Sequence, residues 1–277
     1  MFSDFDDKLF KTDVKFENFD SLNLDYSCGL YDENKLGNTQ KYIVGLLGPR
    51  DKRYSHLVEL ESLKSLWKRQ CDMWIVKDFI YTNDSFGSLD KENIIRKHEA
   101  LTGSIEWEHD LNLHGSNIKE LVFVGLRDNY LVISSKKFIF CLDNTKGILN
   151  WKMERFLGRL LRINENGNSL FGLYRNFIEI DLKSGEFLND TKDPNLFEDF
   201  GNSTRDDYLQ IRDYLITTSN RNPNVWLFNT KKMVFDFALK IDEVKGFSNE
   251  AILFYENKIF AKDAANTLHV IQKKGEW

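Results

Sequence analysis

Proline and long apolar runs are scarce in this chain of 277 residues. It has only 3 prolines, too few for a proline-rich linker protein. No run approaches the roughly 20 apolar residues that a membrane-spanning helix needs. The N-terminal sequence, MFSDFDDKLFKTD, lacks the basic and apolar regions of a signal peptide. We therefore expect neither a membrane segment nor export by such a peptide.

The chain is also poor in cysteine. Cys28, Cys71 and Cys141 form an odd, widely spaced set that contains no CxxC pair. Structural disulfides are typical of oxidising compartments, so this set favours three thiols in a reducing one. The sequence predicts a cytoplasmic protein.

An excess of basic residues is absent as well. The chain has 38 Lys and Arg against 43 Asp and Glu, a formal net charge of -5. Nucleic-acid binding requires a basic face that neutralises phosphates, so the composition argues against such a partner. The short basic clusters at 50–53 and 155–162 are interpreted as solvated surface.

Known catalytic and metal-binding motifs are missing too. The sequence contains no GxSxG, GxxxxGK[ST], GxGxxG or HExxH. His98, His109 and His114 lie close together, but no Cys or Glu completes a zinc-binding spacing, so we interpret them as surface or loop histidines. We predict no catalytic residue, no metal ligand and no cofactor.

What the chain does contain is a recurring turn motif among abundant aromatic residues, which favour strands. The motif starts with an acidic or amide residue, turns at a glycine and places an aromatic residue four positions after it. The clearest copies are 143–151 and 99–107, and a third copy, 181–189, has Asn189 where the others have tryptophan. Weaker copies occupy 59–67, 229–237 and the abbreviated C-terminal segment 267–277.

The starting residues of the motif recur with a near-constant period. They are Glu59, Glu99, Asp143, Asp181 and Asn229, at intervals of 40, 44, 38 and 48 residues. This period is typical of propeller blades with four strands. We expect the acid or amide to bind the turn backbone, the glycine to take a positive φ, and the tryptophan to lie between neighbouring blades.

The segments between the motifs alternate short apolar runs with tight turns. The runs 121–126, 130–134, 138–142 and 148–153 predict the four strands of one blade. The stretch 57–67 could be mistaken for a helix, but the phase of the repeat predicts strand.

The segments ALTGSIEW, LDNTKGILNW and IDLKSGEF resemble the PQQ-like repeat, also called the quinoprotein tryptophan-docking type. The resemblance covers about residues 42–277. It implies an all-β fold: one closed β-propeller domain over 1–277, with four-stranded antiparallel blades. We favour six blades, with residues 1–41 closing the ring through a strand at Lys11–Phe19. Seven blades, with one built from Asp25–Lys41, is the alternative.

PQQ-dependent dehydrogenases share this repeat, which raises an enzymatic interpretation. In that family a quinone lies over the central channel near Ca²⁺, with an Asp as base and often a disulfide between adjacent cysteines. This chain has no adjacent cysteine pair, and no position matches a cofactor-binding residue. We therefore predict that it is not an enzyme; a ligand-binding central channel stays the third interpretation.

Two irregular segments, 83–93 and 189–207, interrupt the rhythm of strands and combine acidic with aromatic residues. Long loops on a rigid scaffold often carry binding residues. The candidate partner-binding residues are Phe86, Asp193, Phe197, Glu198, Asp199 and Phe200.

These observations predict a monomeric, non-catalytic propeller that binds another protein. A small acidic protein of this kind could inhibit a basic partner, as an immunity protein neutralises a toxin. The second interpretation is an assembly scaffold resembling the propeller of the outer-membrane β-barrel assembly machinery, which would require export.

Overall fold

The protein is all-β in the computed structural model. The structure describes residues 2–3, 8–12, 19–23, 29–30, 41–47, 54–59, 61–62, 64–76, 79–83, 93–116, 118–119, 121–154, 161–164, 166–173, 177–191, 209–218, 224–241, 244–247 and 252–272. These residues form strands β1 to β26 and one short 3-10 helix, η1 (Leu111–His114). The chain divides into two compact units, residues 1–118 with 142–149 and residues 119–141 with 150–277.

The first unit contains three antiparallel sheets, in which strands adjacent in sequence are paired. The first has three strands, β1 (Phe2–Ser3), β2 (Lys8–Thr12) and β3 (Phe19–Asn23). The second has four, β4 (Gly29–Leu30), β5 (Tyr42–Leu47), β6 (Tyr54–Glu59) and β7 (Ser65–Arg69). The third consists of β8 (Asp72–Val76), β9 (Phe79–Asn83), β10 (Ile94–His98) and β11 (Ile105–Asp110).

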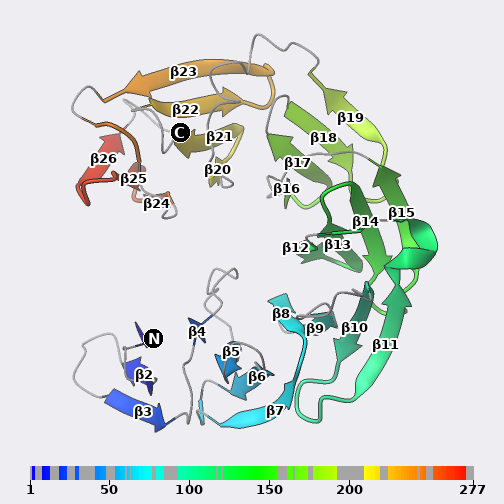
Figure 1. Ribbon diagram of the computed structural model, residues 1–277. Helices are drawn as coiled ribbons and strands as arrows, with labels where there is room; N and C mark the ends of the chain where they lie inside the picture. The colour runs from blue at the N-terminus through cyan, green and yellow to red at the C-terminus, as the bar shows by residue number, and fades with distance from the viewer. Residues whose placement is uncertain are drawn as a thin grey trace. The chain divides into compact units, whose positions relative to one another are not determined.

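The remaining four sheets follow the same antiparallel order (Figure 1). One contains β12 (Val122–Arg127), β13 (Tyr130–Ser134), β14 (Phe138–Asp143) and β15 (Leu149–Glu154), and its β14–β15 turn belongs to the first unit. The next contains β16 (Leu161–Ile163), β17 (Ser169–Leu173), β18 (Phe177–Asp181) and β19 (Phe187–Asp190). Then come β20 (Leu209–Ile211), β21 (Tyr214–Thr218), β22 (Asn224–Asn229) and β23 (Val234–Lys240). The last has three strands, β24 (Leu253–Tyr255), β25 (Lys258–Lys262) and β26 (Leu268–Gln272).

The predicted four-stranded antiparallel sheets are confirmed, since five of the seven sheets that the described residues form have four strands. The number of blades, six or seven, stays a prediction. The expected single strand at Lys11–Phe19 is wrong. Thr12 pairs with Phe19 across the β2–β3 ladder, so this stretch joins two antiparallel strands. Within Asp25–Lys41 the short strand β4 pairs with β5 and belongs to the second sheet. The single domain and the closure of the ring stay predictions.

The recurring motif forms the turn between the third and fourth strands of a sheet. Asp143 Oδ1 accepts hydrogen bonds from the backbone N–H groups of Thr145 (2.8 Å) and Lys146 (2.9 Å), and Asp181 binds its own turn in the same way. The glycine N–H of each turn donates to the carbonyl oxygen of the acid, as in Gly147 to Asp143 (2.8 Å). Gly147 has φ +68°, a left-handed conformation that glycine adopts without steric cost.

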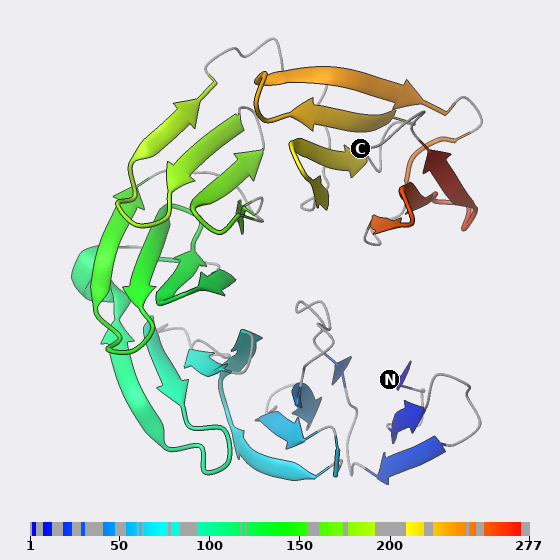
Figure 2. The ribbon, with the colours of Figure 1, turned by 180° about the vertical axis from the view of Figure 1, so that it is seen from behind.

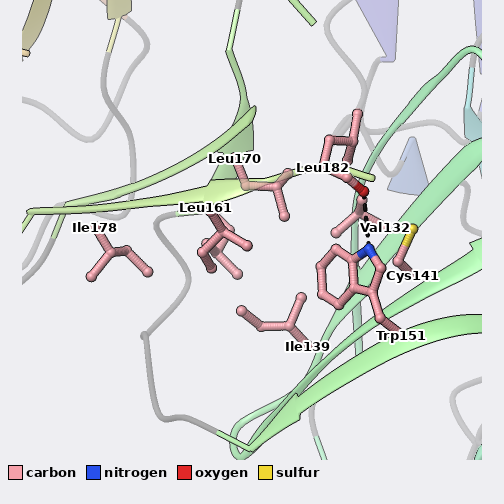
Figure 3. Close-up of a cluster of buried hydrophobic side chains, with 9 residues drawn as sticks. Val132, Ile139, Cys141, Trp151, Leu161, Leu170, Ile178 and Leu182 are labelled. Carbon is pink, nitrogen blue, oxygen red and sulfur yellow. Dashed lines mark hydrogen bonds between the residues drawn. The ribbon is translucent and has the colours of Figure 1, made fainter. Parts of the chain in front are cut away.

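The tryptophans dock on the turn of the following repeat, as the motif predicts. Trp67, Trp107 and Trp151 donate from Nε1 to the carbonyl oxygens of Ala100 (2.8 Å), Asn144 (2.8 Å) and Leu182 (2.9 Å). Each acceptor follows the acid that begins the next motif. Figure 3 shows the bond from Trp151 to Leu182 beside buried residues of β13, β14, β16, β17 and β18.

Each docked indole also lies directly against the glycine of that turn. A Cβ atom built on Gly103, Gly147 or Gly185 would lie 2.6–2.8 Å from the nearest atom of the ring it meets, closer than atoms in contact can approach. The glycine therefore serves two purposes, because it takes the positive φ and leaves room for the indole.

Candidate partner-binding surface

The loop residues predicted to bind a partner lie outside the part of the chain that the structure describes. These are Phe86, Asp193, Phe197, Glu198, Asp199 and Phe200. The candidate site below therefore comes from the described surface alone.

The histidines do not gather into a metal site. His98 is buried on β10, so its interpretation as a surface or loop residue is wrong. Its Nδ1 lies 2.9 Å from the Gly103 carbonyl oxygen, which can only accept, so Nδ1 donates and Nε2 accepts from the Thr82 hydroxyl (2.8 Å). Among the described residues no group of three or more His, Cys, Asp and Glu side chains could hold a metal ion.

His109 and His114 lie nearer the surface and stack on each other, with ring centroids 5.0 Å apart. The pKa of His109 is lowered chiefly by burial and next by the neighbouring His114, against an opposing hydrogen bond to Gly147.

A second polar cluster lies inside the first unit around Lys97. Its ammonium group is 2.8 Å from Glu106 Oε2 and 4.3 Å from the centre of the Phe79 ring. Beside it, Tyr81 donates to Asn144 Oδ1 in the docking turn, and burial raises the pKa of this phenol. Lys97, Tyr81 and Asn144 are buried, whereas Glu106 is exposed. The hydrogen bonds of Tyr81 and Lys97 to Asn144 stabilise the turn on which Trp107 docks.

The last sheet is different, because one of its faces is apolar and exposed. Leu253, Tyr255, Leu268 and Val270 are 61%, 65%, 59% and 53% exposed. Large apolar side chains exposed singly are ordinary, but contiguous ones mark interaction surfaces.

Strand register places these residues on a common face. Leu253 pairs with Phe260, and Phe260 pairs with Val270, so the three form one row across β24, β25 and β26. Tyr255 and Leu268 lie on the same face, in the rows on either side. We call this the β24–β26 face; it consists of Leu253, Tyr255, Lys258, Phe260, Lys262, Leu268, Val270 and Gln272.

On the opposite face of the same sheet, the residues of the central strand are buried. Ile259 and Ala261, which alternate with Phe260 along β25, are 0% and 2% exposed. They pack with Ile216 and Val225 of the preceding sheet and with Phe247 in one apolar cluster. Figures 1 and 2 show β24 to β26 as short strands beside β20 to β23. The buried face fixes the sheet, so the β24–β26 face has a rigid support.

The loop that joins β25 to β26 is held by one carboxylate. Asp263 Oδ1 accepts from the backbone N–H groups of Ala265 (2.8 Å) and Thr267 (2.8 Å), and Oδ2 lies 2.9 Å from His269 Nε2. The bond to His269, followed by those to the loop backbone, holds the pKa of Asp263 below its usual range. This loop sets the position of β26 and hence of Val270.

Sequence reasoning missed the β24–β26 face, although a signal was present. The strands read ILFY, KIFAK and LHVIQ, with apolar residues at consecutive positions, as in strands covered on both faces. Consecutive apolar residues predict apolar side chains on both faces of the sheet. Within the described residues only one of these faces is buried, so the other is an exposed apolar surface.

No protein-family model matches the chain, and no curated protein matches it in sequence. Solved structures do match. BamB from Moraxella catarrhalis is 13% identical at a TM-score of 0.58, covering 94% of this chain and 78% of its own. The computationally designed protein Ika8 is 11% identical at 0.60, covering 86% and 70%.

A further match is the dihydro-heme d1 dehydrogenase NirN, 12% identical at a TM-score of 0.68. It covers 97% of this chain, which spans 59% of the length of NirN. At these identities the likeness concerns the fold alone. The fold is all-β, and its four-stranded antiparallel sheets are the blades of a β-propeller.

Proposed function

We propose that the chain is a non-catalytic, protein-binding β-propeller module. The observation that carries the proposal is the β24–β26 face, an apolar surface on a sheet that is rigidly supported from behind. When a partner covers exposed apolar side chains, their removal from water stabilises the complex by about 25 cal/mol per Å² of apolar surface buried. No helix among the described residues is long and apolar enough to cross a membrane.

The proposal is tested by affinity purification from native lysate with the full chain as bait. The wild-type chain is compared with Val270→Asn, which makes the centre of the face polar. Leu188→Asn is the matched control, because Leu188 on β19 is also 53% exposed. We expect one stoichiometric partner that is lost with Val270→Asn and retained with Leu188→Asn. No partner, or loss with both variants, would refute binding through this face.

A narrower form of the proposal is a cytoplasmic inhibitor that neutralises a basic, toxin-like protein. It is supported by the net charge of -5 and the acidic segment 189–207. Reversing the charges of Asp193 and Glu198 tests it, since recovery of a basic partner should then fall. An absorbing species or metal in the purified protein would instead favour a ligand in the central channel.

A further inference from the structure

We propose that Asn166 is a site of spontaneous deamidation, at which the folded chain converts its own asparagine to aspartate and isoaspartate. Asn166 and Gly167 form the only Asn–Gly step in the sequence. They lie in the turn between β16 and β17, and the Asn166 side chain is exposed. The modification is independent of the proposed function, because no residue of the β24–β26 face takes part in it.

The reaction needs water as its one co-reactant. The backbone nitrogen of Gly167 gives up its proton and attacks Cγ of Asn166, which forms an N–Cγ bond and closes a five-membered succinimide. The side-chain nitrogen leaves with a proton as ammonia. Water then adds to one of the two ring carbonyls and breaks its bond to nitrogen. Breaking the bond at Cγ gives aspartate, and breaking the bond at the backbone carbonyl gives isoaspartate; nothing is oxidised or reduced.

A backbone donor activates the carbonyl group that is attacked. The N–H group of Asn168 donates to Asn166 Oδ1 at 3.1 Å. Attack on Cγ moves negative charge onto this oxygen, so a donor already in place stabilises the tetrahedral intermediate, as the donors of an oxyanion hole do. Because the bond spans Gly167, it also keeps the amide group close to the attacking nitrogen.

The side chain of Arg127 lies against Gly167 and supplies a positive charge. A Cβ atom built on Gly167 would lie 2.2 Å from Arg127 Nε and 2.8 Å from Cζ. Nε is therefore within about 4 Å of the Gly167 Cα atom. A cation at this distance lowers the free energy needed to remove the proton from the Gly167 nitrogen. Glycine itself has no side chain that would shield the nitrogen.

One hydrogen bond opposes the reaction. The Gly167 N–H group donates to the Asn164 carbonyl oxygen (2.8 Å), so this bond must open before the nitrogen can attack. The residues on either side of Gly167, Asn166 and Asn168, are exposed, and opening of such a turn is a local fluctuation. The fold therefore slows the reaction at this bond and promotes it through Asn168 and Arg127.

The conversion changes the contacts between neighbouring sheets. It places a carboxylate in the turn against which Arg127 of β12 lies, and it adds one negative charge to a chain whose net charge is -5. Isoaspartate also lengthens the backbone of the turn by one methylene group. Asn164 of the same turn accepts from Gln210 Nε2 on β20 (2.7 Å), so the longer backbone also affects the junction with the following sheet.

The test follows the full chain during incubation at about pH 8, folded in buffer and unfolded in urea. Peptide mapping by mass spectrometry measures the gain of one dalton at each asparagine, and labelling by an isoaspartate methyltransferase detects isoaspartate. We expect Asn166 to be the most rapidly converted asparagine of the folded chain, at no less than about one tenth of its rate in urea. Arg127→Gln should slow conversion in the folded chain about threefold or more and leave the rate in urea unchanged.

The control is Lys119→Gln, which removes the same charge at an exposed position outside the turn. It should leave both rates within about 1.5-fold of the wild type, since the charge is distant from Gly167. Asn166→Gln should abolish the signal, and circular dichroism checks that each variant is folded. Conversion of Asn166 in urea but not in the folded chain would overturn the inference. A folded Arg127→Gln variant that converts as fast as the wild type would overturn it as well.

Discussion

At the scale of single residues, one side-chain oxygen organises each recurring turn. Asn229 performs this task as well as an aspartate does, since its Oδ1 accepts from the N–H groups of Lys231 (3.1 Å) and Lys232 (3.0 Å). A complete turn was not evident from the sequence here, because Met233 stands at the glycine position. These bonds indicate that an uncharged oxygen acceptor at the start of the turn can hold the turn backbone.

Replacing Asp143 separates the contribution of the oxygen acceptor from that of the negative charge. Asp143→Ala removes both acceptor bonds and should lower the free energy of unfolding by about 1 kcal/mol, as loss of a capping oxygen does. Asp143→Asn keeps the acceptor and should change it by less than about 0.5 kcal/mol. Urea denaturation of both variants provides the measurement. Equal losses would show that charge is what matters.

His109 predicts a dependence of stability on pH. Its pKa in the fold lies below the ordinary value of about 6.5, so the unfolded chain binds the extra proton first as pH falls. As the pH falls from about 6.5 to the lowered pKa of His109, the free energy of unfolding should therefore decrease. Above pH 6.5 this histidine should leave the stability unchanged. His109→Gln should reduce the slope between pH 7 and pH 5 in denaturation midpoints. A variant with an unchanged acid slope would contradict this, and measurements between pH 7.5 and 8.5 serve as the control.

At the scale of the element, tryptophan and glycine form pairs between consecutive sheets. Where the tryptophan is lost, the glycine is lost as well: Asn189 holds the tryptophan position, and Met233 holds the glycine position of the next turn. Met233 keeps the positive φ (+60°) and the backbone bond to Asn229, and it packs beside an apolar cluster that includes Trp226. Asn189 instead donates to Glu179 Oε2 within its own sheet (2.6 Å).

A double-mutant cycle tests this pairing. Gly185→Ala places a Cβ within 2.7 Å of the Trp151 indole at φ +74° and should be clearly destabilising. In a Trp151→Leu background the collision is absent and only the backbone strain of about 1–2 kcal/mol remains. We expect a coupling energy of at least about 0.5 kcal/mol in denaturation experiments. Gly103→Ala with Trp151→Leu is the control, since Gly103 contacts Trp67, and its effects should add.

Much of the element level could be predicted from the sequence, because the turn motif is local. The stretch 57–67 falls in β6 and β7 as the repeat phase indicates, and Tyr130–Ser134 matches β13 to the residue. Strands β1 to β4 were harder to predict, because residues 2–30 contain no copy of the motif that would set the phase of the strands. The β24–β26 face was missed because the consecutive apolar residues of its strands are equally typical of strands covered on both faces.

At the scale of the whole molecule, each of the two units is a series of similar sheets, and within a unit consecutive sheets are in contact. In such repeat proteins stability is close to a sum of terms for each repeat and each junction. A local defect should then spread only as far as the adjoining sheets.

Hydrogen exchange can measure that range. Ile259→Ala removes a fully buried side chain from the cluster behind β25 and should cost about 2–5 kcal/mol. Amide protection should fall in β20 to β26 and stay unchanged in β5 to β11. Ile80→Ala, at an equally buried position in the first unit, should give the reverse pattern. A uniform loss with either variant would show that the units open together.

The tryptophan–glycine contacts give the chain a direction that matters for grafting. A repeat carries a glycine that fits the tryptophan before it and a tryptophan that needs a glycine after it. A repeat transplanted from another protein into the position after Trp67 must therefore bring a glycine at its own turn, whatever the rest of its sequence. Junctions, and not single repeats, are thus the modules that could be exchanged intact.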